Sequence, residues 1–286
     1  MDAGAPRLFR AQGTEWVRGR PLQKVSPQRD HSSTFSARDG AELAFNDSAG
    51  GSPALLFVHG WQADRTIWDP IVAELRDRFR CVAPDFRGFG ASANAPGPYA
   101  LEQYSQDLRA LVESLRLERV VVVGHSMGGK VAVRFALDAP QLVERLVLIA
   151  SVPLGPAGFS EKGVAYLRAT AGNPQAVREW LTKTISAPPS ADVLHRLCDI
   201  ASGASATAVA ESLDSWVLTD LSAEARRVTA PALVIGFEHD APNRLQERVA
   251  ALLPNARFDV VPDCAHYAVL EHPAPVAERI AAFIAD

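Results

Sequence analysis

The sequence has few of the residues that mark secreted or membrane proteins. Its three cysteines, Cys81, Cys198 and Cys264, are scattered and form no C-x-x-C pair, so neither a disulfide framework nor a zinc site is indicated. No apolar run approaches the ~20 residues that a membrane helix needs. The N-terminus also lacks the apolar segment of a signal peptide. These absences predict a reduced, cytoplasmic setting without a membrane partner.

An excess of basic charge is absent too. The 286 residues carry 29 Lys and Arg against 33 Asp and Glu, a net charge of −4, so no basic face is expected to attract nucleic acid. Hydrophobic residues make up 48% of the chain, which is typical of a globular protein. At this length one large domain, with or without an insertion, is favoured over two independent folds.

A stretch near the middle of the chain joins a predicted strand to a predicted helix. Residues 120–123 are four consecutive valines, the pattern of a strand buried on both faces of a parallel sheet. They lead into Gly124-His125-Ser126-Met127-Gly128, which has the form G-x-S-x-G. In such a turn the serine adopts a strained backbone conformation, and the glycines let neighbouring backbone approach closely. We therefore expect the Ser126 hydroxyl to stand at the positive end of a helix beginning at Met127.

Strands and helices alternate along most of the chain. A hairpin is predicted over 34–45, with its turn at Asp39-Gly40. Further strands are expected at 54–58, 81–84, 146–150, 232–235 and 258–261, and helices at 67–75, 101–117, 127–137, 244–253 and 274–285. This alternation predicts an α/β fold, with a mostly parallel central sheet and helices on both faces.

One segment interrupts the alternation. From residue 151 to about 228 no buried strand is indicated, only short helical stretches around 164–170, 174–185, 191–200 and 206–218. The chain is thus divided into an irregular N-terminal extension (1–32), a core (33–150 and 229–286) and an inserted helical cap (151–228). Open α/β sheets place their sites at the carboxyl ends of the strands, so we expect the cap to lie over that end.

Five sequence marks follow one another in a characteristic order. They are His59-Gly60, Asp85-x-Arg87-Gly88-x-Gly90-x-Ser92, Gly124-x-Ser126-x-Gly128, Asp240 and His266. In these marks the chain resembles the α/β-hydrolase fold family, from about residue 33 to the end. The resemblance implies catalytic residues in the order Ser, Asp, His. It also implies a small-molecule substrate and neither a cofactor nor a metal, and it assigns no oligomeric state.

The resemblance assigns Ser126 as nucleophile, His266 as base and Asp240 as acid. A serine hydroxyl needs a base within hydrogen-bond reach, and a histidine with an ordinary pKa near ~6.5 can take and return its proton. A carboxylate on the other ring nitrogen fixes the tautomer and stabilises the imidazolium. Glu238, only two residues before Asp240, is the alternative acid.

An acyl-transfer site also needs two N–H donors aimed at the oxyanion. The backbone N–H of Met127 is one, and the resemblance places the second at Trp61, directly after His59-Gly60. Two other residues of the five sequence marks are expected to be structural. The side chain of His59 is expected to support its own motif, and Arg87 to be an ion-pair partner. His125 is expected to point away from the site, because the neighbouring serine points into it.

A serine at position 126 weighs against the dehalogenase and epoxide-hydrolase branches, which need a carboxylate nucleophile. The predicted function is a serine hydrolase that cleaves small to medium carboxylic esters or lactones through an acyl-enzyme. Three alternatives stay open: a carbon–carbon bond hydrolase, a cofactor-free haloperoxidase or perhydrolase, and a ligand sensor that retains the triad.

Overall fold

The computed structural model describes residues 31–183, 188–240 and 244–286. They form one sheet of eight strands in the order β1-β2-β4-β3-β5-β6-β7-β8. The strands are β1 (His31–Ser36), β2 (Glu42–Asp47), β3 (Ala54–Val58), β4 (Arg80–Pro84), β5 (Val120–His125), β6 (Val143–Ile149), β7 (Ala232–Phe237) and β8 (Ala256–Val261). β1 and β2 pair antiparallel, β2 pairs antiparallel with β4, and all pairs from β4 to β8 are parallel. The predicted α/β fold is confirmed.

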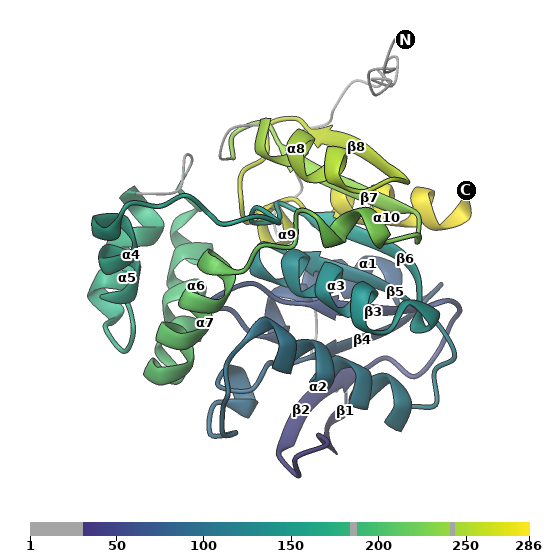
Figure 1. Ribbon diagram of the computed structural model, residues 1–286, viewed down its shortest axis with the longest axis horizontal. Helices are drawn as coiled ribbons and strands as arrows, with labels where there is room; N and C mark the ends of the chain where they lie inside the picture. Colours follow the sequence, from purple (N-terminus) through teal and green to yellow (C-terminus); the bar gives the residue numbers. More distant parts are fainter. Residues whose placement is uncertain (1–30, 184–187, 241–243) are drawn as a thin grey trace.

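Helices cover both faces of the sheet (Figure 1). They are α1 (Asp69–Leu75), α2 (Leu101–Ser114), α3 (Met127–Asp138), α8 (Arg244–Leu252), α9 (Ala268–Glu271) and α10 (Pro273–Ala285). One core lies between the sheet and α2, α3 and α8, and a second lies between the sheet and α1, α9 and α10. Strand β5 serves both, because Val120 and Val122 face the first core and Val121 and Val123 the second. This explains the unbroken valine run.

Four helices follow one another between β6 and β7: α4 (Glu161–Arg168), α5 (Pro174–Lys183), α6 (Ala191–Ser202) and α7 (Ala206–Leu218). We call them the helical insertion. Figure 1 shows them gathered together at one side of the sheet, at the left of the view. Buried residues of α7 join the first core, whereas those of α5 and α6 join the second. The insertion is thus packed onto the sheet domain through both cores.

The element boundaries differ from the predicted ones in several places. His31 and Ser32, which were assigned to the N-terminal extension, already belong to β1, while residues 1–30 lie outside the described residues. β6 begins at Val143, three residues before the predicted start at 146. The half-exposed Glu144 and Arg145 interrupt the apolar pattern there, so the first residues of the strand were not recognised. The helix α9 has four residues, too few for a helical period to be recognised. Among the described helices, none is long and apolar enough to cross a membrane.

The topology brings two loops of the predicted site together. The chain runs from β3 outward to β4 and then returns to the other side of β3 as β5, so the order reverses at β3. Val58, the last residue of β3, pairs with Gly124 of β5. The loop that begins at His59 and the turn that contains Ser126 therefore leave adjacent strands at the same level, at the point where α/β sheets bind ligands.

Candidate active site

Ser126 occupies a strained turn between β5 and α3. Its backbone angles are φ 54° and ψ −119°, outside the regions that residues other than glycine ordinarily adopt. Such a conformation costs on the order of 1–3 kcal/mol and persists only where the surroundings enforce it. Here the Ser126 N–H donates to the carbonyl of Ile149 (3.0 Å), and its own carbonyl accepts from Gly129 (3.0 Å) and Val152 (3.2 Å). Hydrogen bonds to both the N–H and the carbonyl of Ser126 thus hold the turn in this conformation.

Two glycines around this turn lie at places where the chain passes close to other atoms. A Cβ on Gly128 would lie 2.2 Å from the carbonyl oxygen of Val58, so only glycine lets the start of α3 pack against the end of β3. A Cβ on Gly60 would lie 3.1 Å from the Cβ of Ser126. The loop after β3 therefore passes directly beside the serine.

His266 and Asp240 meet although 26 residues separate them. The Nδ1 of His266 lies 3.0 Å from Oδ2 of Asp240, and both side chains are mostly buried. Glu238 is exposed, and its carboxylate instead accepts a hydrogen bond from the backbone N–H of Asp263 (3.0 Å). Of the two candidate acids, Asp240 is the one that contacts the histidine.

The environment of His266 favours its protonated form. Burial by itself would lower the pKa of His266, but the Asp240 carboxylate, through its charge and its hydrogen bond, outweighs this effect and raises that pKa above the ordinary 6.5. With Nδ1–H donating to Asp240, the tautomer leaves Nε2 without a proton and able to accept one.

His125 does not lie apart from the site, contrary to expectation. Its ring centroid is 4.8 Å from that of His266, and its Nε2–H donates to the carbonyl of His266 (2.8 Å). Burial, together with the charge of His266, lowers the pKa of His125 to about 3, so it stays neutral. Alternation along a strand predicts only that His125 and Ser126 point in opposite directions, whereas the loop after β8 brings the carbonyl and ring of His266 to the His125 ring.

The two predicted oxyanion donors are neighbours of the serine turn: Met127 follows Ser126 in the chain, and Trp61 follows Gly60, which lies against Ser126. Met127 is the first residue of α3, and the N–H groups in a first helical turn lack intrahelical acceptors. Within the described residues, the backbone N–H of Trp61 has no acceptor in the protein. Both residues are buried. Each therefore has a main-chain donor that an oxyanion could use.

The remaining motif residues are structural, as expected. The ring of His59 is fully buried, its Nδ1–H donates to the Gly60 carbonyl (2.8 Å), and its Nε2 accepts from the N–H of Phe86 (3.0 Å). Burial lowers the pKa of His59, which keeps this pattern neutral. Arg87 is buried and pairs with Asp107 (2.7 Å). These contacts tie the loops after β3 and β4 together and to α2.

Lys130 is a buried residue that the sequence reasoning did not single out. Its side chain, on α3, donates to the backbone carbonyls of Gly155 (2.9 Å), Trp216 (2.9 Å) and Thr219 (2.6 Å). Burial lowers the pKa of Lys130 to about 8. Lys130 lies one helical turn after Ser126 and is followed in α3 by the apolar residues 131–133. A lysine within such an apolar stretch is the signal that could have identified it. Lys130 thus joins α3 to the chain segments that lead into and out of the helical insertion.

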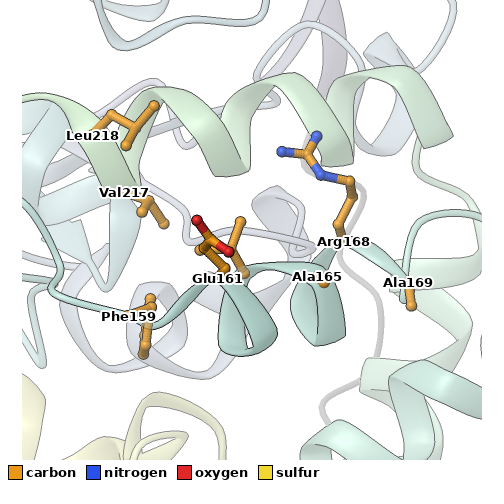
Figure 2. A pocket seen from close by; sticks show the side chains of 8 residues that line it. Phe159, Glu161, Ala165, Arg168, Ala169, Val217 and Leu218 are labelled. Atoms are coloured by element: carbon orange, nitrogen blue, oxygen red, sulfur yellow. The ribbon is translucent and has the colours of Figure 1, made fainter.

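An open pocket of about 700 Å³ lies on the surface of the helical insertion (Figure 2). Its walls come from α4, α7 and the segment before α4: Phe159, Glu161, Val164, Ala165, Arg168, Ala169, Val217 and Leu218. None of the predicted catalytic residues lines it. A separate group of described side chains, Glu238, His239 and Asp263, has ligand atoms within 4.8 Å of one another, but all three residues are exposed to solvent.

Comparison with known proteins places this geometry in a family. A model described as Alpha/beta hydrolase family matches residues 55–279. Three uncharacterized mycobacterial proteins are 39% identical over 132 residues, a match that spans 46% of this chain and 38% of each relative. A putative non-heme bromoperoxidase of Mycobacterium tuberculosis is 30% identical over 269 residues, covering 85% of this chain and 98% of the relative.

Two esterases also resemble the chain over most of its length. A pimeloyl-acyl-carrier-protein methyl ester esterase of Nitrosomonas europaea is 31% identical over 241 residues, covering 79% of this chain and 94% of the relative. The solved structure of a thermophilic esterase from Thermogutta terrifontis superposes with a TM-score of 0.78 at 27% identity, covering 89% of this chain and 98% of that one. The chain belongs to the alpha/beta hydrolase family.

Proposed function

We propose that this protein is a serine hydrolase that cleaves small to medium, uncharged carboxylic esters or lactones. The observation that carries the proposal is the hydrogen bond from His266 to Asp240, in a chain whose Ser126 is held in a strained turn of the G-x-S-x-G form. These three groups have the complementary roles that acyl transfer needs.

In the proposed mechanism, Nε2 of His266 takes the proton of Ser126 while its Oγ attacks the ester carbonyl. The carbonyl oxygen becomes an oxyanion that accepts hydrogen bonds from the N–H groups of Trp61 and Met127. The intermediate collapses, the bond to the alcohol oxygen breaks, and the imidazolium returns its proton to that oxygen. A water molecule, deprotonated by His266, then attacks the acyl-enzyme, releases the acid and restores the serine.

The helical insertion, the predicted cap over 151–228, is proposed to enclose the acyl group. Support comes from the indole of Trp61, which contacts Trp180 of α5 (ring centroids 5.3 Å apart) and Trp216 of α7 (6.2 Å apart). Aromatic and aliphatic side chains at the mouth of a site favour uncharged substrates. The two esterases among the similar proteins support an ester rather than another bond.

A second candidate is peroxide-dependent perhydrolysis, because one relative that covers most of the chain is named a non-heme bromoperoxidase. Such chemistry would use the same acyl-enzyme, with hydrogen peroxide replacing water in the second step. A strict dependence of turnover on added peroxide would favour this candidate over the hydrolase.

The deciding experiment is mass spectrometry of the intact protein during incubation with a p-nitrophenyl ester, with release of nitrophenol followed in parallel. We expect a transient acyl adduct and many product molecules per protein chain, since water regenerates Ser126. A single stoichiometric burst, or no adduct and no product, would contradict the hydrolase and favour a ligand sensor.

A further inference from the structure

Two consecutive side chains of the loop after β3 donate hydrogen bonds to the helical insertion. The indole Nε1–H of Trp61 donates to the carbonyl of Val209 in α7 (2.9 Å). The amide Nε2 of Gln62 donates to Oγ1 of Thr170, just after α4 (2.8 Å), and the Thr170 hydroxyl in turn donates to the carbonyl of Leu167 (2.6 Å). Trp61, Gln62 and Thr170 are all buried. The loop is thus hydrogen-bonded directly to α7 and, through the Thr170 hydroxyl, to α4.

This loop has little room to adjust independently. On one side, Gly60 lies against Ser126, as the 3.1 Å approach of its added Cβ shows. On the other side, Gln62 adopts φ 55°, in the left-handed region that side-chain-bearing residues rarely occupy. The peptide N–H of Trp61 lies between these two constrained residues. Moving either side chain would therefore move the N–H.

We propose that helices α4 and α7 set the position of the Trp61 N–H, with the side chains of Trp61 and Gln62 as positioning residues. The inference rests on the proposed function, in which this N–H stabilises the oxyanion. An oxyanion donor acts only when it points at the place where negative charge develops, and small displacements weaken it strongly. The insertion is then part of the catalytic apparatus as well as a wall of the pocket.

The test uses two variants from opposite sides of the contact. Trp61→Phe keeps an aromatic ring between Trp180 and Trp216 but removes the donor to Val209. Thr170→Val keeps the shape of the threonine but removes the partner of Gln62, without changing the loop itself. The matched control is Ser215→Ala, because the Ser215 hydroxyl accepts from the N–H of Leu101 (3.0 Å) and so joins α7 to α2 away from the loop.

We expect Trp61→Phe to lower kcat roughly 10-fold and Thr170→Val by a smaller factor, with KM unchanged within about twofold. A trifluoromethyl ketone, which forms a tetrahedral oxyanion on the serine, should lose affinity by the same factors. The matching methyl ketone, which binds without forming that charge, should keep its affinity. A merely structural role would weaken both ketones alike.

Wild-type kcat and trifluoromethyl ketone affinity in both variants would overturn the inference, as would an equal loss in Ser215→Ala. Should Trp61→Phe fail to fold, Thr170→Val decides alone. A wild-type protein that turns over no ester and forms no ketone adduct would overturn the proposed function and this inference with it. An active wild type with unaffected variants overturns the inference only.

Discussion

Ser126 is the side chain on which the proposed chemistry depends most. Ser126→Ala should remove labelling by a fluorophosphonate probe and lower turnover by about 10³-fold or more, because the proposed acyl-enzyme forms on the Ser126 hydroxyl. Alanine leaves the turn intact, so the folded state should persist. Labelling and turnover at the wild-type level would contradict the assignment of the nucleophile.

Asp240 and Glu238 offer a matched pair of acids two residues apart. Asp240→Asn should lower kcat by about 10³-fold, since the amide favours the wrong tautomer of His266. Glu238→Gln should have an effect within about threefold, because Glu238 is exposed and its carboxylate accepts a hydrogen bond from the Asp263 backbone. Steady-state rates on one ester check both variants. The reverse ranking would transfer the acid's role to Glu238.

The pKa of His266 predicts the acid side of the pH profile. The base must be neutral to take the serine proton, and Asp240 raises its pKa above 6.5, so kcat/KM should fall below an inflection that lies above pH 6.5. Asp240→Asn removes the charge that raises this pKa and leaves the burial that lowers it. The inflection of the residual activity should therefore move to lower pH, and a move to higher pH would contradict the argument.

At the scale of elements, Lys130 connects α3 to the helical insertion. Lys130→Met should destabilise the fold by about 1–3 kcal/mol, because the carbonyls of Gly155, Trp216 and Thr219 lose their donor. Lys162→Met is the matched control, since Lys162 is exposed on α4. Urea unfolding followed by circular dichroism measures both. Equal stability of the two variants would contradict a structural role for Lys130.

The same lysine gives the unfolding free energy a dependence on pH. The folded-state pKa of Lys130 is about 8, below its ordinary 10.5, so between these values the unfolded chain binds more protons than the folded one. The wild-type protein should therefore gain stability relative to Lys130→Met as the pH rises through this window. A relative loss over that window would show that the pKa is not lowered.

At the scale of the whole molecule, the helical insertion is packed onto both cores of the sheet domain, and in the proposed function it covers the acyl group. Hydrolysis should be fastest for p-nitrophenyl esters of short or medium acyl length and slow for palmitate, because a closed pocket limits the chain it can hold. A series of esters from acetate to palmitate, assayed as monomers, checks this. Rates that rise to palmitate and increase further at a lipid–water interface would indicate a lipase instead.

The sequence alone determined the features that repeat at short range. The valines of β5 predict a strand buried on both faces, and the short helical stretch expected around 206–218 corresponds to α7. The serine turn lies between that strand and helix α3, where its motif indicated. When one face of a helix or strand is buried, apolar residues recur along the sequence with the period of that element, and when both faces are buried they form a continuous run. Such elements can therefore be predicted without coordinates.

Only the tertiary structure decided which distant groups meet. Asp240 and Glu238 are nearly equivalent in sequence, yet one reaches His266 and the other turns to solvent, because β7 and β8 end side by side with a defined register. The position of His125 beneath His266 and the bonds from Trp61 and Gln62 to the insertion join residues roughly 100 or more positions apart. Such contacts depend on how whole elements pack against one another, and the hydrophobic period within a single helix or strand does not predict that packing.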